Sequence, residues 1–459
     1  MNRLYNCRNL KRKEDGETMS ESSFVGKTRN LYKQVCETEW EANITGVIVA
    51  LLSILLMVWW RPWGAVGAIR NWGDWLLSFV GGATPKSIFI DSGSVIGIGF
   101  LGGAFLSAFL AGQFAFRFPP YREAVKGAIA GVLMGVGSAL AGGCNVGGMY
   151  NALGNLAANG FSMWLGIVAG VLLGLWLIYK EMEHISWGDN GAWTVDLPRE
   201  LQTLLGLLTF FALLAGARWY SSYSGEDNAD IITSLSGVLL LAAGIGYAMH
   251  RGRWCMIQGF REPHMTGDCT LAKSVALSIF VLAIGGAVVK YAVPVKGAAV
   301  LNPAYYVRGT FGWGGVLGGF LFGIGGMFAG GCGSGTLWRV GEGQLKLWIV
   351  VPFFGIANSL MTKWFSMDVE VSGNGLKSLM AQAKLGLIGY DVDEVKEAIA
   401  TGGSLTVSGI EKAGYLGRYI YMPDAIGFGW TLTIITFMMA LWYVVVTWNE
   451  ESNKLIVPM

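Results

Sequence analysis

The sequence predicts an all-α polytopic membrane protein with about nine to eleven helical segments, in two pseudo-symmetric halves that contain broken or re-entrant helices. Three observations support this fold class. Of the 459 residues, 53% are hydrophobic and only 14% are charged, which is unlike a water-soluble globular chain. Long uncharged runs recur along the chain, and a glycine-rich motif with one cysteine occurs twice. The net charge of +2 gives no indication of nucleic-acid binding.

The uncharged runs set the number of membrane segments, because a hydrocarbon core about 30 Å thick takes about 20 apolar residues of helix per crossing. The run 127–179 has 53 residues, and as one helix it would be about 80 Å long. It must therefore break, and we expect the break at the glycines around Cys144. A transmembrane β-barrel would instead show alternating strands of about ten residues. The runs are 42–60, 92–116, 127–179, 201–217, 231–249, 274–289, 309–338, 347–362 and 425–448.

The duplicated motif is the most specific feature of the sequence. Its first copy reads Ala141-Gly-Gly-Cys144-Asn-Val-Gly147, and its second copy reads Ala329-Gly-Gly-Cys332-Gly-Ser-Gly335. Of the fourteen positions that end at Cys144, eight recur at an offset of 188 residues. We interpret this as an internal duplication, and paired broken segments in two halves are typical of a transporter site at the repeat interface.

The order of polar and apolar stretches predicts six parts of the chain. Eight Lys or Arg residues precede the first apolar run and favour a cytoplasmic amino terminus. No small-residue cleavage site follows that run, so we expect it to remain as an anchor. The parts are a polar cytoplasmic N-terminal segment 1–43, a first transmembrane half 44–180, a connector 181–200, a second transmembrane half 201–364, a polar extramembrane insert 365–424, and a final transmembrane helix with its tail, 425–459.

Segment 61–82 is aromatic and weakly charged, and we expect an interfacial or re-entrant piece there. Its tryptophans, and those just before it, are expected at the membrane boundary, where this residue type is enriched. They are Trp59, Trp60, Trp63, Trp72 and Trp75. Cys7 and Cys36 lie in the polar N-terminal segment, where we expect exposed side chains without a role.

The two motif cysteines, Cys144 and Cys332, are the leading candidates for a solute pathway. Irregular backbone at membrane depth is tolerated only where it faces protein or a water-filled cavity. The preceding glycines allow a solute to come close, and a thiol adds a weak donor and a polarizable surface that suits a sulfur- or selenium-bearing anion. The alternative is that both cysteines are small hydrophobes packed among helices. The motif glycines are Gly142, Gly143, Gly330 and Gly331.

The loop 250–269 carries two further cysteines, Cys255 and Cys269, each five residues after a histidine, His250 and His264. A Cys₂His₂ zinc site is one interpretation, but these spacings exceed those of common ligand pairs and nearby arginines oppose a cation, so we predict no metal. A basic loop at the cytoplasmic face is a second interpretation. A third is that Cys255 opens the second half and lines the same path as Cys144 and Cys332.

Arg339 lies seven residues after Cys332 and three before Glu342. It would either attract an anion to the mouth of a pathway or pair with Glu342, and the sequence favours neither. No cofactor motif and no base beside either motif cysteine are visible, so we predict a transporter that is not an enzyme and needs no cofactor.

Together, these motifs resemble the YeeE/YedE family of sulfur-transport membrane proteins, most closely its long YedE-type branch. The resemblance rests on the two Gly-Gly-Cys segments, on Arg253-Trp-Cys255-Met-Ile-Gln-Gly-Phe-Arg261, and on Trp338-Arg339-Val-Gly-Glu342-Gly. It implies an inner-membrane protein with an hourglass-shaped path, which takes up thiosulfate past Cys144 and Cys332. It also implies a third thiol at Cys255, whereas the first-half counterpart, in the segment from Gly64 to Trp75, has no cysteine.

The resemblance further implies a possible partner, a small sulfur-carrier protein of the TusA type, and a link of the YedE branch to selenium. We therefore expect import of a sulfur-containing anion, most specifically thiosulfate. A selenium compound as the solute, and a thiol-dependent membrane oxidoreductase or sulfurtransferase, are the alternatives.

Overall fold

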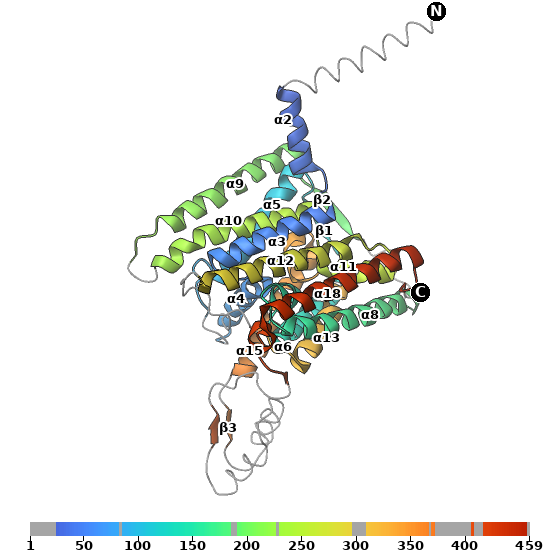
Figure 1. Ribbon diagram of the computed structural model, residues 1–459. Helices are drawn as coiled ribbons and strands as arrows, with labels where there is room; N and C mark the ends of the chain where they lie inside the picture. The colour runs from blue at the N-terminus through green and yellow to red at the C-terminus, as the bar shows by residue number, and fades with distance from the viewer. Residues whose placement is uncertain are drawn as a thin grey trace, which may run out of the picture.

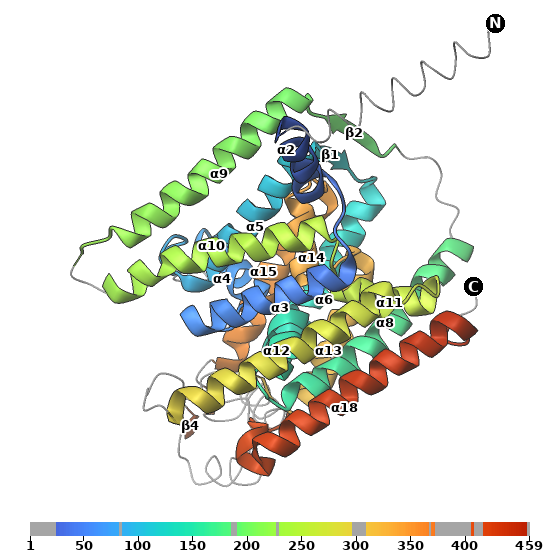
Figure 2. The same cartoon turned by 45° about the horizontal axis from the view of Figure 1, so that its top comes forward.

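The computed structural model describes residues 24–81, 85–184, 191–225, 229–295, 309–366, 369–371, 405–407 and 416–456. Long helices lie side by side in a bundle, and shorter ones lie between them (Figure 1, Figure 2). In the first part of the chain, the helices are α2 (Phe24–Tyr32), the π-helix η1 (Lys33–Glu37), α3 (Ala42–Trp59), α4 (Ala65–Ser78), α5 (Ser92–Ala111), α6 (Tyr121–Ala141), the π-helix η2 (Asn145–Tyr150), α7 (Asn151–Gly154) and α8 (Asn159–His184). In the second part, they are α9 (Arg199–Ser221), α10 (Ala229–Arg251), α11 (Met256–Met265), α12 (Thr270–Val295), α13 (Trp313–Ala329), α14 (Gly333–Val340), α15 (Leu345–Ser366) and α18 (Met422–Ser452).

Ten helical stretches in the described part of the chain are long and apolar enough to cross a membrane, which agrees with the predicted number. Three of them are composite: Tyr121–Gly154 contains α6, η2 and α7, Ala229–Met265 contains α10 and α11, and Trp313–Val340 contains α13 and α14. The named strands form two short antiparallel pairs, β1 (Ala115–Phe118) with β2 (Trp193–Asp196), and β3 (Val369–Val371) with β4 (Leu405–Val407). The predicted all-α, multi-pass membrane fold is confirmed.

The helix ends gather at two faces of the bundle. One end, called the N face below, carries α2 and η1, and there Arg199 at the start of α9 pairs with Glu37 at 2.7 Å. The other end, called the opposite face, carries the end of α3 and the start of α5, where Arg61 donates to the Ser92 hydroxyl at 2.9 Å. Helix α3 therefore runs from the N face to the opposite face, and α5 returns.

Helices α6 and α13, which lead into the two motif copies, cross at glycines. A side-chain carbon on Gly137 would lie 2.5 Å from the Gly318 carbonyl oxygen, and one on Gly318 would lie equally close to the Gly137 oxygen. Further along α13, Gly325 faces Ala130 and Met134 of α6. The two helices are therefore antiparallel, and only small residues permit their backbones to approach this closely.

Around this crossing, helices of the two predicted halves pair in a reciprocal pattern. Helix α6 packs along α15 and α13 packs along α8, while α3 packs along α12 and α10 packs along α5. In the α6–α15 pair, Gly131 faces Val350 and Gly135 faces Ala357, so these two helices run in the same direction. Each half thus covers the other, which is the arrangement expected of two interleaved pseudo-symmetric halves.

Both motif copies break their helices in the same way. Helix α6 ends at Gly142 with φ 76° and ψ 15°, and α13 ends at Gly330 with φ 81° and ψ 15°. This left-handed conformation favours glycine because it has no Cβ. Next, Cys144 is extended at φ −75° and ψ −179°, and Cys332 at φ −76° and ψ −177°. The predicted break at Cys144 is confirmed, and its twin lies at Cys332.

The predicted interfacial or re-entrant piece 61–82 forms the short helix α4, whose first residue follows the extended Gly64. Among its tryptophans, Trp63 does not lie at a boundary: its side chain is only 2% exposed and donates to the Ser53 hydroxyl at 2.7 Å. That part of the prediction was wrong, because Trp63 precedes a helix that turns into the protein. Trp59, by contrast, is 54% exposed.

The polar parts of the chain are described only in places. Residues 1–23, which include Cys7, and most of the insert 365–424 lie outside the described residues, and the bounds of the six predicted parts remain predictions. Cys36 was expected to be exposed but is buried, and its carbonyl oxygen accepts a hydrogen bond from the buried Arg251 at 2.7 Å, which holds this turn against α10. In the connector, Trp193 of β2 pairs with Phe118 of β1.

Candidate functional site

The three predicted site cysteines lie together at the centre of the bundle. The sulfur atoms of Cys255 and Cys332 are 3.5 Å apart, within hydrogen-bonding distance of two thiols. Cys144 lies against Gly333, the residue after Cys332: a side-chain carbon on Gly333 would be 3.3 Å from the Cys144 sulfur. All three side chains are buried. The structure thus gathers thiols that are up to 188 residues apart in sequence.

Two helix amino termini meet at the second-half thiols. Cys332 is the N-cap residue of α14, and its sulfur accepts a hydrogen bond from the Gly335 amide at 3.2 Å. Cys255 is the N-cap residue of α11. The amino end of a helix carries a partial positive charge and unpaired amides. The thiol pair therefore lies where negative charge is favoured.

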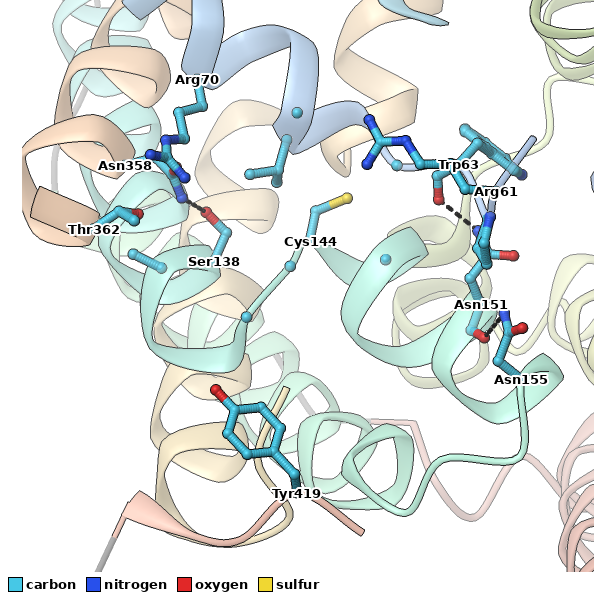
Figure 3. A pocket seen from close by; sticks show the side chains of 18 residues that line it. Arg61, Trp63, Arg70, Ser138, Cys144, Asn151, Asn155, Asn358, Thr362 and Tyr419 are labelled. Atoms are coloured by element: carbon cyan, nitrogen blue, oxygen red, sulfur yellow. Dashed lines mark hydrogen bonds between the residues drawn. The ribbon is translucent and has the colours of Figure 1, made fainter. Parts of the chain in front are cut away.

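A cavity of about 510 Å³ leads from the opposite face to Cys144 (Figure 3). It is lined on one side by the motif residues Gly142, Gly143, Cys144 and Gly147. Its outer part opens to solvent, because the Arg70 side chain that lines it is 45% exposed. In Figure 3 the Cys144 sulfur projects into the space between the labelled side chains.

The cavity is cationic. Arg61 and Arg70 line it, and the other described lining residues include no Asp or Glu. The carboxylate of Asp74 lies 3.8 Å from the Arg70 guanidinium on the next turn of α4. Opposite charges attract strongly where water is restricted, so this lining suits an anion better than a cation.

Asparagine side chains hold the cavity wall together. Asn151 donates to the Trp63 carbonyl oxygen at 2.6 Å and thereby fastens the turn before α4 to the motif segment. Asn358 of α15 donates to the Ser138 hydroxyl at 2.8 Å, just before the break in α6. Both bonds are drawn in Figure 3. The wall therefore consists of side chains from α4, α6, α7 and α15 in fixed positions.

The two halves differ where a second thiol would lie. In the second half, Cys255 approaches Gly335, on which a side-chain carbon would be 2.8 Å from the Cys255 sulfur. In the first half, the residue next to Gly147 is Gly64, on which a side-chain carbon would be 3.6 Å from the Gly147 Cα atom. Since Gly147 and Gly335 are equivalent motif positions, Gly64 takes the place of a cysteine. The absent side chain leaves this side of the cavity open.

The N face beyond the thiol pair is closed by charged residues. Glu342 is buried and pairs with Arg253 at 2.8 Å and with Arg117 at 3.4 Å. Arg339 instead donates to the Gly330 carbonyl oxygen, and its guanidinium lies 4.5 Å from the centre of the Trp338 ring. Of the two predicted alternatives for Arg339, pairing with Glu342 is not found among the ion pairs of the described residues.

The histidines and cysteines of loop 250–269 do not form a cluster. The His250 ring bonds to the Ser107 hydroxyl at 2.8 Å, and His264 bonds to the Leu455 carbonyl oxygen at 2.8 Å. Cys269 is buried apart from Cys255, and burial raises the pKa of the Cys269 thiol. The described residues contain no group of three or more metal-ligating side chains. The zinc interpretation of this loop therefore finds no support in the fold.

Several cavity residues were not singled out from the sequence. Arg61 and Arg70 lie in a segment that was interpreted as an aromatic interfacial or re-entrant piece without a role in the site, and Asn358 lies within an uncharged run. A signal was present for the arginines, because charged residues within or beside a re-entrant segment mark solute pathways. For Asn358, only its contact with Ser138 gives it a place in the site.

Comparison with known families identifies the family to which this chain is similar. A family model described as sulphur transport matches residues 5–173 and 251–386 of this chain. The two matched regions contain both motif copies, Cys255, α4 and α11. Between them, α9 and nearly all of α10 lie outside the match.

Curated relatives extend the comparison. The "Probable transporter YedE" of Escherichia coli (strain K12) is 27% identical over 311 residues, which is 63% of this chain and 72% of that protein. The "Thiosulfate transporter TsuA" of Escherichia coli (strain K12) is 34% identical over 128 residues, 28% of this chain and 34% of the relative. The "Thiosulfate transporter TsuA" of Spirochaeta thermophila is 34% identical over 118 residues, 26% of this chain and 33% of the relative.

Proposed function

The chain belongs to the sulphur transport family, and from this premise we propose that it imports a sulfur-containing anion, most specifically thiosulfate, across the inner membrane. Family membership and the names of the relatives indicate a transporter rather than an enzyme. The name of one group of relatives also supports thiosulfate as the solute. The route that we propose passes Cys144 first and then Cys332 and Cys255.

The observation that carries the proposal is the cationic cavity that ends at a thiol. Thiosulfate has two chemically different ends, a soft outer sulfur and a sulfonate group with hard oxygens. Arg61 and Arg70 are suited to the oxygens, since guanidinium groups bind oxyanions through several donors. Cys144 is suited to the sulfur, because a thiol is a weak donor with a polarizable surface. The cavity lining therefore matches both ends of this anion.

The direction of transport follows from the orientation that we propose. The basic N-terminal segment favours a cytoplasmic N face. The cavity then opens on the outer side, where a solute enters, and the thiol pair lies between the cavity and the cytoplasm. Import from the outer side to the N face is consistent with this order of groups.

Uptake of labelled thiosulfate into cells or vesicles that contain the protein tests the proposal. Cys144→Ala should abolish uptake while the protein still reaches the membrane. Cys269→Ala is the matched control, because this thiol is also buried but lies away from the cavity, and it should transport normally. Normal uptake by Cys144→Ala would remove this thiol from the mechanism. Among sulfate, sulfite and selenite as competitors, competition by sulfate alone would contradict recognition of a soft atom.

A sulfurtransferase is the second candidate function, and the 3.5 Å separation of the Cys255 and Cys332 sulfurs favours it. In that reaction a cysteine thiolate attacks the outer sulfur of thiosulfate. The sulfur–sulfur bond breaks, its electron pair leaves with sulfite, and a cysteine persulfide remains. Mass spectrometry of the protein after turnover distinguishes the two functions. A persulfide on any of the three cysteines would favour the transferase, and its absence during active uptake would exclude it.

The solute and the partner are finer parts of the proposal. A selenium compound would also suit the thiols, since they recognise a soft atom, and competition of thiosulfate uptake by selenite tests this alternative. A TusA-type carrier at the N face would receive sulfur after passage. Co-purification of the protein with such a carrier, dependent on an intact N face, would support that partner.

A further inference from the structure

Asn145 lies between the two motif copies and is used by none of the interactions described so far. It follows Cys144 directly, and its side chain is 0% exposed. Its Oδ1 atom accepts a hydrogen bond from the Gly333 amide at 3.3 Å. Gly333 is the residue at the equivalent position of the second copy, so one half has a carboxamide where the other has none.

The orientation of this carboxamide is fixed by its partner. The Gly333 amide is a donor, so the oxygen of Asn145 must face it and the nitrogen must point away. That nitrogen is buried and has no hydrogen-bond partner in the described part of the chain. A buried donor without a partner is costly, and native proteins leave few of them. The two N–H groups of Asn145 therefore require an acceptor from outside the protein.

The position of the carboxamide indicates which acceptor this is. Gly333 contacts the Cys144 side chain on one side and follows Cys332 on the other. Through its bond to Gly333, the Asn145 carboxamide therefore lies beside the step between the thiol at the end of the cavity and the thiol pair. Thiols are weak donors, so a solute that leaves Arg61 and Arg70 behind needs another donor for its oxygens at this step.

We propose that the Asn145 carboxamide binds the oxyanion end of the solute while its sulfur passes from Cys144 to Cys332. This inference rests on the proposed function and adds to it the group that recognises the oxygens at the step between Cys144 and Cys332. Asn145 is then a specificity residue: it favours a soft anion that carries oxygens, such as thiosulfate, over a soft anion without them, such as hydrosulfide.

The sharpest test is Asn145→Asp, because this change separates the two possible roles of the residue. Aspartate has the same shape and keeps an oxygen for the Gly333 amide, so a merely structural role predicts near-normal uptake. It replaces the N–H donors with a second oxygen, so the proposed role predicts a rise of at least about tenfold in the KM for thiosulfate, since hydrogen bonds to charged groups are strong.

Asn145→Ala removes the donors without adding a charge, and Asn145→Ser restores one small donor. The expected order of thiosulfate KM is wild type lowest, then Ser, then Ala and Asp. Hydrosulfide should inhibit the uptake by the Ala variant and the wild type at the same concentration. Thermal unfolding of each purified variant checks that it is folded, and the Ser variant keeps the test valid should Asp or Ala fail to fold.

Wild-type KM values for both Asp and Ala would overturn the inference. This failure is distinct from failure of the proposed function, which would show as no thiosulfate uptake by the wild-type protein or normal uptake by Cys144→Ala. The inference would also be overturned if Asn145→Ala weakened inhibition by hydrosulfide by the same factor as it raised the KM for thiosulfate. The carboxamide would then not discriminate between the two anions.

Discussion

Substitution by alanine should impair the protein at Gly335 but not at Gly147, although these glycines are equivalent positions of the two motif copies. In α14, a methyl group on Gly335 would lie 2.8 Å from the Cys255 sulfur and 3.2 Å from the Cys332 sulfur. In η2, a methyl group on Gly147 would meet no atom within 4 Å, because this position faces the cavity. The same change thus tests whether the thiol pair has to keep its position.

The size of the effect at Gly335 follows from these distances. Unstrained contacts between non-bonded heavy atoms are about 3.5–4.0 Å, so the Cys255 sulfur would have to retreat by about 0.7–1.2 Å. Overpacking of this kind costs about 1–3 kcal/mol of stability. The better helix propensity of alanine offsets about 0.5–1 kcal/mol of this cost. We therefore expect a loss of stability of about 0–2.5 kcal/mol for Gly335→Ala. The displaced thiols should reduce thiosulfate uptake much more than the protein level.

The assay compares both variants with the wild type in labelled thiosulfate uptake and in thermal unfolding after purification. Gly147→Ala should keep its stability and most of its uptake, since one methyl group takes up little of a cavity of about 510 Å³. Gly335→Ala should lose most of its uptake. Equal uptake by the two variants, or a greater loss for Gly147→Ala, would refute the assignment of the thiol pair to the route.

Three further predictions concern the packing, the N face and a peripheral thiol. Gly137→Ala should reduce the amount of folded protein in the membrane, because its methyl group would lie 2.5 Å from the Gly318 backbone oxygen. Gly429→Ala is the control and should have no effect, because its methyl group would meet no atom within 4 Å. Equal amounts of the two folded variants would contradict this packing. Glu342→Gln should lower the free energy of unfolding by about 1–2 kcal/mol, which thermal unfolding measures. This value is lower than that of a fully buried ion pair, because the two arginine partners of Glu342 are 37% and 40% exposed. An unchanged unfolding temperature would contradict this prediction. In a variant that keeps only Cys269, maleimide labelling should be slow near neutral pH, and its rate should still increase at pH values well above neutral. The reason is that the raised pKa of this thiol keeps the reactive thiolate scarce. A labelling rate that is already constant at neutral pH would contradict this.

The sequence predicted the broken helices because a simple physical limit applied. A run of 53 uncharged residues cannot form one crossing, and glycine beside Cys144 was the place where the chain could turn. The repeat then transferred the same prediction to Cys332, and the matching backbone angles at both cysteines agree with it. Local sequence was sufficient here, since both the break and its cause lie within a few residues.

Long-range contacts could not be predicted in the same way. The loop around Cys255 left three interpretations open, because nothing local indicates that this residue lies 3.5 Å from a sulfur that is 77 positions later in the chain. Asn358 reaches Ser138 only because α15 packs along α6. Gly64 gave no local signal of its own, since the feature that matters there is an absent side chain next to Gly147; only the family resemblance marked the missing cysteine in this region.

The two motif copies have the same backbone conformation, but different groups lie beyond them at the two faces of the bundle. This difference bears on the proposed transport step. At the opposite face, the first-half thiol is reached through a cavity with arginines and without a nearby thiol partner. At the N face, the second-half thiols lie behind Arg339, Trp338 and the ion pairs of Glu342. On the route that we propose, a solute that reaches Cys332 would leave toward the N face only if these contacts separate. An anion there would compete with Glu342 for Arg253 and Arg117, so the solute itself would carry the charge that weakens this closure.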